Sequence, residues 1–263
     1  MRSLLNSLLC VLALAAAAET PAVPDRFTMQ GAPSPFWISL SSAVDSHGTL
    51  RKDTVPAHMY DDIVRRIADR ERRTATSVQA QMSAGEIGTL APCGDFIITT
   101  HRTTVGPLKS WDEVAQSAAA IYLGTVTAVT PGFQGSVPTS VLRVEHLKVF
   151  RAAPGFPSDG PLYVLYPSAD FSVNGRRVCN AGPDPFYRPM TGDQILIVAH
   201  DPPVDREGRF LTTEEEQAIF ARGERLVIPA RLRPDESRKL RSLDRLASSL
   251  VEAPRRSGAE PQR

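Results

Sequence analysis

Apolar and alternating runs in the middle of the chain predict a β-rich domain over residues 90–211. Residues 141–146 alternate apolar and polar side chains with period two, which is typical of a strand with one buried face. Residues 121–129, 162–166 and 194–199 are apolar runs of strand length, and the last of them reads as a central strand. Several short strands at this spacing indicate a small antiparallel barrel.

Glycines mark two positions where these strands should bend or turn. Gly124 lies inside the run 121–129 and suggests a bulge or a sharp bend. Asn174-Gly175 lies between two short runs of β-forming residues and is the strongest short signal for a hairpin. Residues 226–228 predict an additional edge strand after the barrel.

A different spacing, of three and four residues, predicts helices on both sides of the β-rich domain. Met59, Ile63 and Ile67 recur every four residues within a helix expected over residues 57–81, whose opposite face is rich in arginine. Thr213 precedes three glutamates and should start another helix. Asp235 should cap a last helix, in which a leucine stripe docks on the core. The stripe consists of Leu240, Leu243, Leu246 and Leu250.

The N-terminal segment has the pattern of a secretory signal. Arg2 precedes an apolar run, and small residues before Glu19 offer a cleavage site, so residues 1–18 are expected to be a signal peptide. The run is shorter than the roughly 20 apolar residues of a membrane-spanning helix. We therefore expect an exported chain, periplasmic or extracellular, with no transmembrane segment after cleavage.

These patterns divide the chain into six expected parts and give its fold class as α+β. They are the signal peptide (1–18), a weakly ordered N-terminal segment interrupted by prolines (19–56), an amphipathic helix and linker (57–89), a small antiparallel five-stranded OB-like β-barrel domain (90–211), C-terminal helices (212–252) and a disordered tail (253–263). In this architecture, helices flank the barrel at both ends.

Charge narrows the classes of partner. The formal net charge is +1 and charged residues make up 22% of the chain, a balance that gives no reason to expect nucleic acid as a partner. The arginine-rich face of the first helix could contact a membrane or nucleic acid, or could be an ordinary solvated face.

Several segments of the barrel domain resemble a known family. An apolar strand ends in Gly124-Thr125-Val126, another enters Lys148-Val149-Phe150, and Cys179 and Gly192-Asp193 follow, the latter just before residues 195–199. In this order, over residues 118–200, they resemble the barrel of tissue inhibitors of metalloproteinases and netrin-like modules, above all their bacterial secreted forms. The resemblance implies a five-stranded OB-type barrel.

The chain departs from that family at its cysteines. The inhibitors chelate a protease zinc through an N-terminal Cys-x-Cys, whereas here Cys93 stands alone with a long segment before it. Zinc-protease inhibition is therefore not expected. What the resemblance does imply is a disulfide between Cys93 and Cys179, with two free thiols as the alternative.

Catalytic and metal-binding patterns are sparse. The five histidines lack the spacing of a zinc helix, and no serine-hydrolase elbow or phosphate-binding loop occurs, so no cofactor or metal is expected. His200-Asp201 could act as a base and its orienting group. The loop 182–190 presents Phe186, Tyr187 and Arg188 among prolines, which suggests a contact hot spot, or else a loop whose aromatic residues fill one end of the core.

The sequence thus favours an exported, non-enzymatic protein that binds a protein or a component of the cell envelope. The expected contact residues are Phe186, Tyr187 and Arg188, and no catalytic residue is assigned. The alternatives are an envelope hydrolase without a recognisable motif and a structural component of the envelope.

Overall fold

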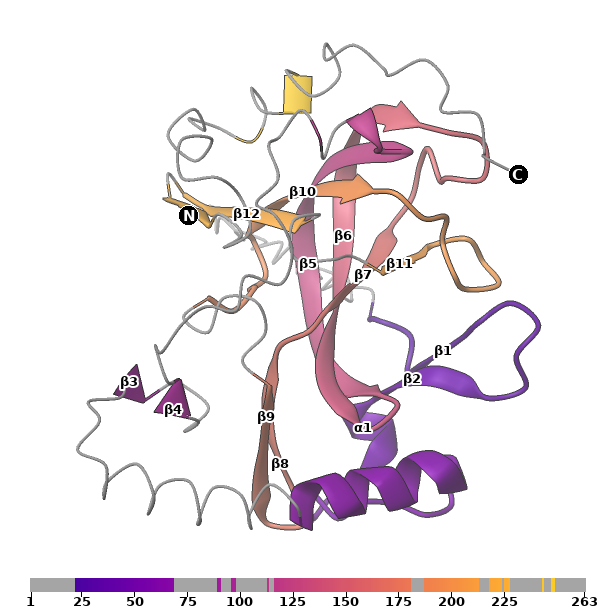
Figure 1. Ribbon diagram of the computed structural model, residues 1–263, viewed down its shortest axis with the longest axis vertical. Coiled ribbons are helices and arrows are strands. Elements are labelled where there is room, and N and C mark those ends of the chain that lie inside the picture. Colours follow the sequence, from indigo (N-terminus) through magenta and orange to yellow (C-terminus); the bar gives the residue numbers. More distant parts are fainter. Residues whose placement is uncertain are drawn as a thin grey trace, which may run out of the picture.

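A long pair of strands, β5 (Ala120–Gln134) and β6 (Val137–Ala152), runs through the fold (Figure 1). Their upper halves belong to a large sheet, and their lower end meets a smaller layer of α1 (Leu40–Ala43) and the helix of residues 57–68. The computed structural model describes residues 22–68, 89–90, 96–97, 113, 116–180, 187–212, 218–223, 225–227, 243 and 247–248.

The large sheet is open and mixed. Its main path runs β11-β7-β6-β5-β10-β12-β13, while β2 pairs with the lower end of β5 and β1 pairs with β2. β11 lies parallel to β7, and the other neighbours are antiparallel. Its other strands are β1 (Arg26–Thr28), β2 (Pro35–Ser39), β7 (Leu162–Tyr166), β10 (Gln194–Ala199), β11 (Phe210–Thr212), β12 (Ala218–Arg222) and β13 (Arg225–Val227). Two separate pairs are β3 (Thr89–Leu90) with β4 (Phe96–Ile97), and β8 (Ala169–Val173) with β9 (Arg176–Asn180).

The prediction of a closed five-stranded barrel is wrong. The path of the large sheet starts at β11 and ends at β13 without returning to its beginning. The reason lies in β5 and β6, which have 15 and 16 residues and extend well beyond the apolar runs that predicted them. Their lower halves pair with each other and with β2, so the hairpin projects from the sheet as an arm (Figure 1). Of the predicted flanking helices, the described residues contain residues 57–68 and helical positions at 243 and 247–248.

The predicted bend at Gly124 is confirmed. The pairing of β5 with β6 shifts register between Leu123 and Thr125. A Cβ at Gly124 would lie 2.5 Å from Val144 Cγ1 and 2.9 Å from the Glu145 carbonyl oxygen, so only glycine fits this close approach. The bulge lets the long hairpin twist out of the sheet.

The sheet is covered on both faces, which explains why its central strand β10 is apolar on both sides. In β10, Ile195 and Ile197 pack into one core and Leu196 and Val198 into another, which confirms it as a central strand. Leu243 lies in the second core, as expected for a leucine that docks. Leu240, Leu246 and Leu250 lie outside the described residues.

The helix predicted to start at Thr213 does not continue through residues 218–222, which form β12 instead. Thr213 itself lies outside the described residues. Ile219 and Phe220 point to opposite faces and pack into the two cores that β10 also joins. Burial on both faces of a sheet outweighed the local charge pattern of a helix start. The predicted edge strand at 226–228 corresponds to β13.

The segment expected to be weakly ordered contains β1, β2 and α1. Trp37 and Ile38 of β2 are fully buried, so this strand docks on the core. Ser39 caps α1 by accepting a hydrogen bond from the Ser42 amide, and its hydroxyl donates to Asp25. No helix in the described part of the chain is long and apolar enough to cross a membrane.

Candidate binding groove

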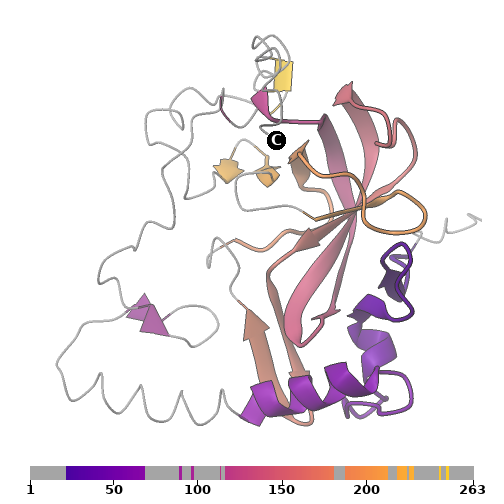
Figure 2. The same cartoon turned by 45° about the vertical axis from the view of Figure 1, so that its right-hand side comes forward.

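A groove lies between the helix of residues 57–68 and strand β9, at the lower end of the fold, where Figures 1 and 2 place the helix beside the β8–β9 hairpin. Two adjoining depressions form it, and Ile67 lines both. The one nearer the tip of the β5–β6 hairpin holds about 310 Å³ of empty space, including its open mouth. Apolar side chains line its floor, namely Ile63, Ile67, Phe133 and Val178, and arginines line it as well, namely Arg66, Arg176 and Arg177.

The helix supplies one wall of the groove through its spacing. Met59, Ile63 and Ile67 are buried in the lower core, as their four-residue repeat predicted. Val64 lies at the edge of this stripe, lines the groove and remains 39% exposed. Arg66 also lines the groove, and among the described residues no carboxylate pairs with it.

The neighbouring Arg65 behaves differently. Its guanidinium pairs with Asp62, three residues earlier on the same helix, and its side chain is 71% exposed. Arg65 does not line either depression. The two adjacent arginines therefore form a natural pair for comparison, one in the groove and one outside it.

The β8–β9 hairpin supplies the opposite wall, and its turn is the one that the sequence predicted. Asn174 and Gly175 have φ values of 53° and 72°, the left-handed conformation that a two-residue hairpin turn requires. The Asn174 side-chain oxygen accepts from the Leu50 amide at 2.9 Å, and the Asn174 amide donates to the Gly48 carbonyl at 2.8 Å. These bonds hold the hairpin tip against the N-terminal segment and so fix β9 beside the helix.

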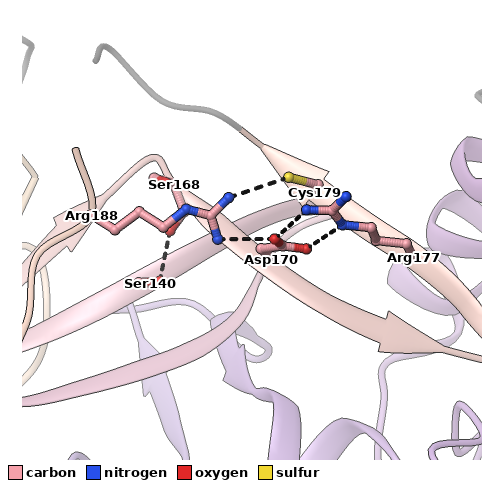
Figure 3. Close-up of polar contacts among 6 residues, drawn as sticks. All are labelled: Ser140, Ser168, Asp170, Arg177, Cys179 and Arg188. Carbon is pink, nitrogen blue, oxygen red and sulfur yellow. Dashed lines mark hydrogen bonds and ion pairs between the residues drawn. The ribbon is translucent and has the colours of Figure 1, made fainter. Parts of the chain in front are cut away.

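Asp170 of β8 gathers two arginines beside the groove (Figure 3). Arg177 donates from Nε to Asp170 Oδ1 at 2.8 Å and from Nη2 to Oδ2 at 2.6 Å, and Arg188 donates from Nη1 to Oδ2 at 3.0 Å. The hydrogen bonds from Arg177 are the largest cause that holds the pKa of Asp170 below its ordinary value, against the effect of burial. Two guanidinium groups thus share the Asp170 carboxylate.

The base of the same hairpin is tied to β6. Ser140 donates from its buried hydroxyl to the Ser168 carbonyl at 2.6 Å (Figure 3). Asn180, at the end of β9, donates from its side chain to the Pro138 carbonyl at 3.1 Å. With both its tip and its base attached, the hairpin presents Arg177 at a fixed position.

Of the predicted contact residues, the structure places Tyr187 in the core. Its side chain is 5% exposed and packs against Phe220, with ring centroids 5.1 Å apart. This position fits the alternative in which the loop fills one end of the core, so Tyr187 is not available for contact with a partner. Arg188 is partly exposed and pairs with Asp170, and Phe186 lies outside the described residues.

The Tyr187 hydroxyl donates to Asp193 Oδ2 at 2.7 Å. Arg222 donates to both oxygens of the same carboxylate, at 2.8 and 2.9 Å, and the Met190 amide donates at 2.8 Å. Burial and the bond to Asp193 raise the pKa of Tyr187. Burial alone would raise the pKa of Asp193, but the hydrogen bonds from Arg222 and Tyr187 hold that pKa below its ordinary value. These hydrogen bonds connect the segment 187–193 to β12 at the end of the main core.

Cys179 is buried in β9 and lines the groove, where Arg188 Nη2 lies 3.8 Å from its sulfur. Cys93 lies outside the described residues, so its pairing with Cys179 stays a prediction.

The structure adds no catalytic arrangement around the histidines that it describes. His200 follows β10, its Nε2 is buried, and no described residue hydrogen-bonds to that nitrogen, whereas Asp201 is exposed. No group of three or more metal-binding side chains occurs among the described residues.

Comparison with protein-family models, with curated proteins and with solved structures found no match for this chain. The functional argument therefore depends on the groove. Sequence reasoning did not identify it, because Arg66 and Arg177 are separated by more than a hundred residues. The available signal was two of the chain's four Arg-Arg dipeptides, those at 65–66 and 176–177, each of which is followed or preceded by an apolar residue.

Proposed function

We propose that this chain is an exported, non-enzymatic binding protein that holds its partner in the groove between the helix of residues 57–68 and β9. The observation that carries the proposal is the combination of an apolar floor with arginines in one fixed groove. Binding sites typically combine apolar contact area with a few placed polar groups, and arginine is enriched among residues that dominate interfaces. Export is inferred from residues 1–18.

Three features support this location over the loop 182–190. Val64 is one of few large apolar side chains of the described residues that are well exposed, and it lies in the groove. Both walls are held by packing and by hydrogen bonds, which lowers the ordering cost of binding. The loop, by contrast, directs Tyr187 into the core.

Site-specific photo-cross-linking tests the proposal. A photoreactive amino acid at position 64 of the full chain, expressed in its own cells, should yield a discrete adduct in the exported fraction. Arg66→Glu should greatly reduce that adduct.

The matched control carries the photoreactive residue at Met29, another exposed apolar position, which belongs to the β1–β2 region. No adduct from position 64, or the same adducts from position 29, would overturn the proposal.

A further inference from the structure

We draw no further inference here: the strongest candidate, the groove between the helix of residues 57–68 and β9, belongs to the site already described, and nothing in the described part of the chain shows what covers its apolar floor.

Discussion

Replacing Tyr187 tests whether the loop after residue 186 belongs to the core. Tyr187→Phe removes only the hydroxyl that donates to Asp193, while Arg222 and the Met190 amide still serve that carboxylate. The expected loss is about 1.5 kcal/mol, the low end for a hydrogen bond to a charged group. Tyr187→Ala also empties the space beside Phe220, which adds about 3–5 kcal/mol and gives a total of about 4.5–6.5 kcal/mol.

Urea unfolding measures these losses through the transition midpoint. Tyr187→Phe should also lower Tm by about 3–6 °C for a chain of this size. Arg188→Ala is the matched control. Arg188 follows Tyr187 in the sequence, its side chain is partly exposed, and its ion pair with Asp170 contributes about 1 kcal/mol or less. If Tyr187→Ala unfolds at the same urea concentration as the parent chain, the core position of Tyr187 is refuted.

Two further perturbations follow from the packing and the charges. Gly132→Ala should destabilise the chain by about 1–3 kcal/mol, because its Cβ would lie 2.6 Å from Trp37 Cζ2 and would also overlap the Ile38 carbonyl oxygen; an unchanged urea midpoint would contradict this close approach of β2 and β5. The pKa of Asp193 is lower in the folded chain than its ordinary value of about 3.9. Ionised Asp193 therefore stabilises the fold fully at pH values above about 3.9, and this stabilisation is lost as the pH falls through the folded-state pKa. The raised pKa of Tyr187 acts on the other side, since its contribution is complete below about pH 10 and is lost as the pH rises further. Thermal melts across pH should show that Tm falls at both the acid and the alkaline end. Asp193→Asn should reduce the fall at acid pH, and Tyr187→Phe should reduce the fall at alkaline pH. Variants whose Tm depends on pH as steeply as that of the parent chain would contradict these assignments.

Local patterns predicted much of the secondary structure because they depend on neighbours in sequence. The Asn174-Gly175 turn needs only two residues that accept positive φ, and both the turn and its strands are confirmed. The run at 162–166 coincides with β7, and the run at 194–199 coincides with β10. The four-residue stripe of Met59, Ile63 and Ile67 is likewise buried as expected.

The overall topology was harder to predict from the sequence, since it depends on which strands pair with one another. The apolar runs did not reveal that β5 and β6 continue through prolines at the lower end of the hairpin, where Pro131 pairs with Ser140 and Pro138 pairs with Phe133. Because the lower end of β5 pairs with β2, the β5–β6 hairpin extends beyond the strands that were expected to form a barrel. The same pairing brings Trp37 into the core. Similarly, the glutamates after Thr213 favour a helix locally, whereas Phe220 gains more from burial in a two-faced sheet.

The net charge of the whole chain and the charge around one groove are different quantities, and the reason is physical. A formal charge of +1 for the whole chain gives no reason to expect an acidic ligand. At physiological ionic strength, however, the Debye length is about 8 Å, so exposed charges farther away are largely screened. Charged side chains on other faces of the fold therefore contribute little to the electrostatic potential at the groove that Arg66 lines. The relevant quantity is the balance of charge within one screening length of the groove, and only the fold, by placing the helix beside β9, determines it.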